Sequence, residues 1–203
     1  MDTYLLYIVV AIATISLPGP AVMLTINNAI QRGFWKAISG IFGVAIGIFC
    51  IALLSATGIG VILEQSRVAF TLVKFIGAAY LIYLGIKMLR AKPSANTLLN
   101  MRGTTYGKCF FEGFLVSTSN PKAIIFFVSI LPQFIASNES YIAQLITLAL
   151  TFGVLVVLIH CVYTLLAVTA KSRFMSRGKS SWLNKVSGGV FVSFGIGLAA
   201  TSR

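Results

Sequence analysis

The chain has 203 residues, of which 58% are hydrophobic and 10% are charged, and its mean hydropathy is +0.94. A soluble domain usually carries about 25% charged residues, so this composition excludes an ordinary soluble protein. The formal net charge is +12, but the cations gather between apolar runs, which indicates membrane topology and not nucleic-acid binding. We therefore expect an all-α polytopic membrane protein with no nucleic-acid partner.

The first apolar run, about Tyr4–Ile26, contains a sequence that cannot continue a helix, Ser16-Leu17-Pro18-Gly19-Pro20. Each proline lacks an N–H, so the carbonyls of Thr14 and Ser16 lose their helical partners. Inside a bilayer, such groups need another partner. Broken helices of this kind commonly form the substrate sites of transporters. The alternative interpretation is a kink that only shapes packing.

Five further spans are expected in chain order, at about Ile38–Leu63, Val68–Leu89, Phe110–Ile135, Ile142–Thr169 and Val186–Ala200. In the second span, Gly40, Gly43 and Gly47 lie on neighbouring turns, a spacing that lets helix backbones approach closely. The fourth span contains a second break, at Asn120-Pro121-Lys122.

Charge predicts the orientation of the spans. One side of the membrane receives Arg32, Lys36, Lys87, Arg90, Lys92, Arg102, Lys108, Lys171, Arg173, Arg177, Lys179 and Lys185, most of them in loops. The opposite side receives Arg67, Lys74 and Arg203. The positive-inside rule places the richer side in the cytoplasm, so both termini are predicted to be periplasmic.

The two breaks fall at matching places in the two halves of the chain, about 1–95 and 105–203. The third span opens with Lys74-Phe75-Ile76-Gly77 and the sixth with Lys185-Val186-Ser187-Gly188. Three spans per half means that the second half crosses in the opposite sense. We expect one transmembrane domain, residues 1–203, built as an inverted repeat of three plus three helices with helices 1 and 4 broken.

Several motifs carry a family resemblance. They are Ser16-Leu17-Pro18-Gly19-Pro20, then Gly77-Ala78-Ala79-Tyr80-Leu81-Ile82-Tyr83-Leu84-Gly85, then Gly113-Phe114-Leu115, Asn120-Pro121-Lys122-Ala123, Phe126-Phe127 and Leu131-Pro132-Gln133-Phe134. In this order, over essentially the whole chain, they resemble the LysE/RhtB family of amino-acid exporters. The resemblance implies a bacterial inner-membrane exporter of amino acids or close derivatives, driven by proton antiport.

A zwitterionic amino acid needs hydrogen-bond donors for its carboxylate and acceptors for its ammonium. The half-helix that restarts after Pro20 is expected to present the free N–H groups of Ala21, Val22 and Met23 to the carboxylate. The carbonyls of Thr14 and Ser16 would suit the ammonium, and Gly19 would allow close approach. The candidate substrate-binding residues are Ser16, Pro18, Gly19, Pro20, Asn27, Tyr80, Asn120, Pro121 and Lys122.

Lys122 lies near the middle of its span, where a charge is costly unless it is paired or hydrated. Three roles compete: binding a carboxylate, coupling to protons, and bridging the freed carbonyls. Asn120 is expected to bond backbone groups at its break. The candidates for proton coupling are Lys122, His160 and Glu112, and no carboxylate lies deep in a span. Neutral substrates are therefore favoured over basic ones.

Other classes of protein fit less well. An enzyme would need a nucleophile–base pair or two cysteines near the breaks, and neither is present. A metal-ion exporter of the same superfamily is the alternative, although it would need clustered carboxylates, histidines or thiolates. The cysteines, Cys50, Cys109 and Cys161, form no CxxC pair, so we expect no metal and no cofactor. The expected partners are an amino acid, protons and lipid, with the chain acting as a monomer or a homodimer.

Overall fold

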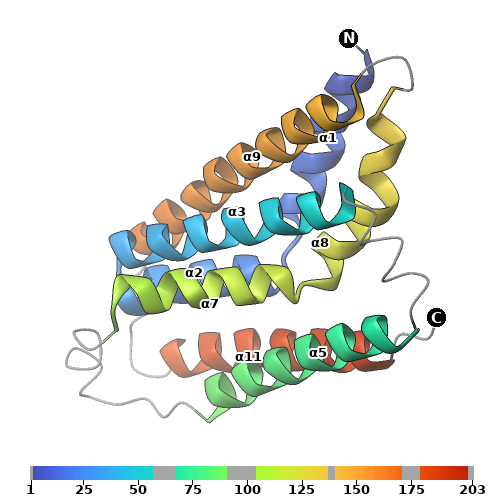
Figure 1. Cartoon of the computed structure of the whole chain (residues 1–203). Helices are drawn as coiled ribbons and strands as arrows, with labels where there is room; N and C mark the ends of the chain where they lie inside the picture. The colour runs from blue at the N-terminus through green and yellow to red at the C-terminus, as the bar shows by residue number, and fades with distance from the viewer. Residues whose placement is uncertain (1, 57–66, 91–103, 137–139, 171–178, 201–203) are drawn as a thin grey trace.

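A computed structural model describes residues 2–56, 67–90, 104–136, 140–170 and 179–200 (Figure 1). Every regular element within these ranges is a helix, which confirms the predicted all-α class. The α-helices are α1 (Asp2–Ser16), α2 (Pro20–Arg32), α3 (Phe34–Ala56), α5 (Arg67–Leu89), α7 (Tyr106–Thr118), α8 (Pro121–Ile125), α9 (Tyr141–Thr169) and α11 (Lys179–Ala200).

Two of the described helices are long and apolar enough to cross a membrane, over Phe34–Ser55 and Tyr141–Thr169. The pair Thr3–Ser16 and Pro20–Arg32 makes a third if it forms one bent span. The apolar parts of α5 and α11, Phe75–Leu89 and Lys185–Gly197, are shorter. The outer face of α9 carries apolar side chains that are more than half exposed, including Leu150, Val154 and Leu158. Such a surface suits contact with lipid.

Both predicted breaks are present at the predicted residues. Between α1 and α2, the chain bends by 59° after Ser16, and α2 begins at Pro20. Between α7 and α8, the helix stops at Thr118 and restarts at Pro121. Proline is well suited to the first position of a helix, because its missing N–H would have no helical partner there. The prolines therefore end one half-helix and begin the next.

Two of the predicted boundaries are wrong. The expected loop around Arg32 and Lys36 is reduced to Gly33, whose φ of 89° favours glycine. The last helix begins at Lys179 instead of Val186, so Lys179 and Lys185 lie in α11 and not in a loop. The predicted turn at Glu64, the stretch 91–103, Glu139 and the stretch 171–178 lie outside the described residues.

The fourth span also departs from a simple broken helix. After α8, the chain continues as a π-helical segment, Phe126–Ile130, and then as a 3₁₀ segment, Leu131–Phe134. Sequence periodicity gave no sign of either form. The change in helical pitch turns Phe126, Phe127 and Leu131 into the core, where each is at most 1% exposed.

Glycines bring two pairs of helices into close contact. On α3, a Cβ at Gly43 would lie 2.8 Å from the carbonyl carbon of Phe110, and one at Gly47 would lie 2.9 Å from the carbonyl oxygen of Phe114. These distances forbid a larger residue, which confirms the predicted role of the glycines. α3 and α7 run in the same direction. α5 and α11 form an antiparallel pair, seen together along one side of the bundle in Figure 1, with Gly85 against Gly188.

Candidate functional site

The two breaks meet at a small cavity in the centre of the bundle. Its volume is about 30 Å³. Its lining comes from α1, α2, α3, α8 and α9, together with Asn120 before α8, and includes Thr14, Ala21, Val22, Asn120, Lys122, Ala123, Phe152 and His160. A space of this size holds about one water molecule, so an amino acid cannot fit in this conformation. The breaks are thus neighbours across a small cavity.

Lys122 spans the cavity from the second break to the first. Its Nζ donates one hydrogen bond of 2.8 Å to the carbonyl of Thr14 and another of 2.8 Å to the carbonyl of Leu17. The Thr14 carbonyl is one of the two that the prolines were predicted to free. The expected acceptor is therefore occupied by an ammonium group. This group belongs to a side chain of the protein and not to a substrate. Of the three roles considered for Lys122, this contact corresponds to bridging the freed carbonyls.

The other freed carbonyl also has a side-chain partner. The hydroxyl of Tyr163, on α9, donates a 2.8 Å hydrogen bond to the carbonyl of Ser16. Sequence reasoning missed Tyr163. A signal was available, because Tyr163 follows His160 by three residues and so shares one face of the helix with it.

The second break is closed by its own residues. The side chain of Asn120 accepts a 3.1 Å hydrogen bond from the backbone N–H of Lys122, which caps α8 as predicted for this residue. The N–H of Ser119 bonds to the carbonyl of Leu115, and that of Asn120 bonds to Ser117. None of these hydrogen bonds at the second break involves a residue from a distant helix.

The beginning of α2 is open to the cavity. Gly19 is its N-cap and makes no side-chain cap, while Ala21 and Val22 line the cavity. The expectation of a free N–H at Met23 is wrong, because that group bonds to the carbonyl of Gly19 at 2.9 Å. Gly19 and Pro20 are buried, and Pro18 is exposed. An anion at this end of α2 would face the positive end of the helix dipole.

His160 is 2% exposed and borders the same cavity. Its Nδ1 lies 2.8 Å from the hydroxyl oxygen of Thr25 on α2. That hydroxyl also donates to the carbonyl of Ala21 at 3.0 Å. Since a hydroxyl has one hydrogen, donation to Ala21 leaves Nδ1 of His160 as the donor to Thr25. The histidine therefore joins α9 to α2 just beyond the break.

Glu112 lies away from the cavity lining. It pairs with Arg32 at the end of α2, and Nη2 of Arg32 is 3.3 Å from Oε1 of Glu112. The sequence assigned Arg32 to a loop as a topology signal, so this partly buried ion pair was missed. It connects α2, which follows the first break, to α7, which precedes the second.

The remaining candidates lie outside the cavity lining. Asn27 is 6% exposed and accepts a 2.7 Å hydrogen bond from Gln31. Asn28, its neighbour, is buried, and neither atom of its amide has a partner in the described part of the chain. Both asparagines are inside the bundle, not at its surface. Tyr80 packs against the main hydrophobic core.

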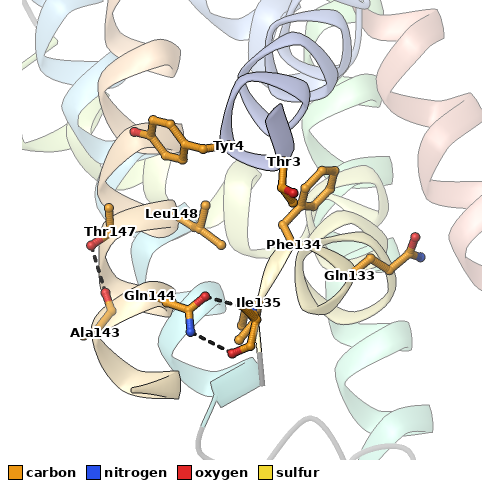
Figure 2. A pocket seen from close by; sticks show the side chains of 10 residues that line it. Thr3, Tyr4, Gln133, Phe134, Ile135, Ala143, Gln144, Thr147 and Leu148 are labelled. Carbon is orange, nitrogen blue, oxygen red and sulfur yellow. Dashed lines mark hydrogen bonds between the residues drawn. The ribbon is translucent and has the colours of Figure 1, made fainter. Parts of the chain in front are cut away.

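A larger pocket, about 580 Å³, lies where α1 and α9 begin. Figure 2 shows its lining, which includes Thr3, Tyr4, Gln133, Phe134 and Gln144. The amide of Gln144 exchanges two hydrogen bonds with the backbone of Ala136, of 2.8 and 2.9 Å. None of the lining residues is charged. The pocket is large enough for an amino acid, but Lys122 and the Thr14 carbonyl lie at the central cavity.

Aromatic rings separate the pocket from the cavity. Phe134 borders the pocket and lies 5.3 Å from the ring of Tyr7. Tyr7 is 6.1 Å from Phe126, which is 4.6 Å from Phe152 at the cavity. Tyr7 is fully buried, and its hydroxyl donates to the carbonyl of Leu148 at 2.7 Å. These four residues, the aromatic row, run from the pocket to the cavity.

In the described residues, no group of three or more His, Cys, Asp or Glu side chains gathers in a way that could hold a metal ion.

Comparison with known proteins gives a consistent result. A family model described as LysE type translocator matches residues 12–202. An uncharacterized membrane protein of Vibrio cholerae is 31% identical, over 100% of this chain and 98% of its own length. The membrane protein YrhP of Bacillus subtilis is 31% identical, over 97% and 98% of the two chains. A homoserine/homoserine lactone efflux protein of Salmonella typhimurium is 30% identical, over 90% and 89%. No solved structure matches the chain.

Proposed function

Because this chain belongs to the LysE type translocator family, we propose that it exports a small, neutral amino acid or a close derivative across the bacterial inner membrane. The family consists of transporters, and the chain is a multi-pass membrane protein. The transport is proposed to be proton antiport, with both termini in the periplasm. The observation that carries the proposal is the central cavity, where two helix breaks bring carbonyl groups, a helix N-terminus and Lys122 together.

The name of one group of relatives limits the class of substrate to be considered. The Salmonella protein is named for efflux of both homoserine and homoserine lactone. The lactone has no free carboxylate, so a site that accepts both compounds must recognise a group that they share. The α-amino group is such a group. Backbone carbonyls freed by proline are suitable acceptors for it, which supports placing the substrate at the first break.

We also propose the six-span inverted repeat. The matching positions of the two breaks and their meeting at one cavity support it. So do the parallel course of α3 and α7 and the antiparallel course of α5 and α11, since both follow from six successive crossings. In this arrangement, the 580 Å³ pocket opens on the periplasmic side and receives the substrate after it passes the aromatic row.

The test is transport by the purified protein in liposomes under an imposed pH gradient, with labelled homoserine, threonine, leucine and lysine. We expect gradient-dependent flux of a neutral amino acid. Lys122→Met should reduce the flux to that of empty liposomes while the protein still inserts. Lys185→Met, which alters an exposed lysine of α11, should transport normally.

One result would reject the role given to Lys122, and another would reject the proposed export itself. Retained flux in Lys122→Met would remove the functional role of this lysine. No flux of any amino acid under either gradient, from folded protein, would instead favour the metal-ion exporter, and the same liposomes would then be assayed with divalent cations.

A further inference from the structure

The first break carries an acceptor site for a cation, and the protein fills that site itself. Nζ of Lys122 lies 2.8 Å from the carbonyl oxygens of both Thr14 and Leu17. The Thr14 carbonyl is available because Pro18 cannot donate to it. The group that occupies the site is a primary ammonium, and an α-amino acid carries the same group.

Resting on the proposed export of amino acids, we propose that Lys122 is a tethered competitor of the substrate. Its ammonium occupies the subsite for the substrate's ammonium in the empty protein, and the substrate must displace it. Two ammonium groups cannot share one pair of carbonyls, because like charges at that separation repel strongly. The cavity volume of about 30 Å³, with Lys122 in its lining, leaves no space for a second one.

The contacts of Lys122 suit a group that exchanges. Both acceptors are neutral carbonyls, so displacement leaves no unpaired anion behind, unlike the breaking of an ion pair such as Arg32–Glu112. The lysine side chain is flexible and is only partly buried. Beside it lies Gly19, where an added Cβ would be 3.6 Å from Nζ. The ring of Phe194 borders the same place, 3.8 Å from that Cβ position, so Gly19 itself adds no side chain between the ammonium and the first break.

The experiment measures equilibrium binding by purified protein at pH 6, where an α-amino group is charged. The decisive ligand is homoserine lactone, which has the ammonium and no free carboxylate. N-acetylhomoserine, with a carboxylate and no ammonium, is the matched comparison. If the competitor occupies its site about nine-tenths of the time, Lys122→Met should bind the lactone about tenfold more tightly than the unaltered protein. Binding of N-acetylhomoserine should not become tighter.

Two more variants keep the test decisive if Lys122→Met does not fold. Lys122→Arg retains a cation and should bind the lactone about as the unaltered protein does. Lys122→Gln removes the charge but keeps a donor, and should bind the lactone more tightly. Lys185→Met should have no effect on any ligand.

The possible failures differ from one another. Lactone binding that is unchanged or weaker in folded Lys122→Met or Lys122→Gln, with clear binding by the unaltered protein, would overturn the competitor and leave the proposed export intact. Absence of binding of the lactone, homoserine, threonine and leucine to the unaltered protein would overturn both, because the substrate class would then be wrong.

Discussion

The two helix breaks are made by the same residue, proline, but they are held in different ways. At the second break, Asn120 caps its own helix and the adjoining N–H groups bond to carbonyls one turn back. At the first break, no side chain caps α2, and the freed carbonyls are bonded by Lys122 and Tyr163 from other helices.

This difference indicates which of the two breaks, each a joint between half-helices, can change its conformation. A joint closed by local hydrogen bonds keeps its shape when neighbouring helices move. A joint closed by side chains of α8 and α9 loses its partners when those helices move, and it then needs new ones. The first break is therefore the place where conformation and ligand binding are most directly linked, and the following variants test this view in order of expected effect.

The largest effect on stability is expected from Glu112→Gln, which acts where the end of α2 is tied to α7. The change leaves Arg32 charged and mostly buried without its partner. Breaking a buried pair in this way costs about 3 kcal/mol. Thermal unfolding in detergent should show it, and the exchanged pair Arg32→Glu with Glu112→Arg should recover part of the loss. An unchanged melting temperature in the single variant would mean that the pair does not hold α2 to α7.

Tyr163→Phe removes one external support of the first break. The carbonyl of Ser16 then loses its donor, at a cost of about 1–2 kcal/mol. We expect a smaller fall in melting temperature than for Glu112→Gln, together with a several-fold change in transport, because the first break loses its hydrogen bond to α9. Tyr141→Phe, at an exposed tyrosine of the same helix, is the control. Equal effects of the two tyrosine variants would contradict the assignment.

Asn120→Ala tests the second break. Loss of an N-cap costs about 1 kcal/mol, and we expect lower stability with unchanged ligand preference, because the Asn120 side chain bonds to its own helix and the substrate's ammonium is proposed to lie at the first break. Asn120→Asp should restore the cap. If Asn120→Ala changed which amino acid is transported while leaving the melting temperature unaltered, the two breaks would not differ as proposed.

Gly19→Ala should have the smallest effect on folding. The backbone angle of Gly19, φ −156°, is open to any residue, and the nearest atoms to an added Cβ are 3.6 Å or more away. Stability should therefore stay within about 0.5 kcal/mol, while the added methyl beside Lys122 should weaken substrate binding a few-fold. Gly33→Ala offers a contrast, because φ there is 89° and stability should fall.

The sequence predicted the parts of this arrangement that depend on neighbouring residues. Proline chemistry located both breaks and named Thr14 and Ser16 as the carbonyls that would need partners. The amide of Asn120 was predicted as a local fastener. The partners themselves were beyond such reasoning, because Lys122 and Thr14 are 108 positions apart and Arg32 and Glu112 are 80 apart. These contacts depend on how α2, α7, α8 and α9 pack together, which no local pattern encodes.

The aromatic row also bears on whether water and protons can cross the membrane through the protein. Protons cross membranes along connected chains of water molecules, and a cell that maintains a proton gradient loses energy through every such chain. Apolar constrictions interrupt them because water does not stay in contact with apolar walls. Tyr7 and Phe126 are at most 1% exposed, and the cavity beyond them has a volume of about 30 Å³. In this conformation, the buried rings and the small cavity thus work against a continuous chain of water molecules along this part of the bundle.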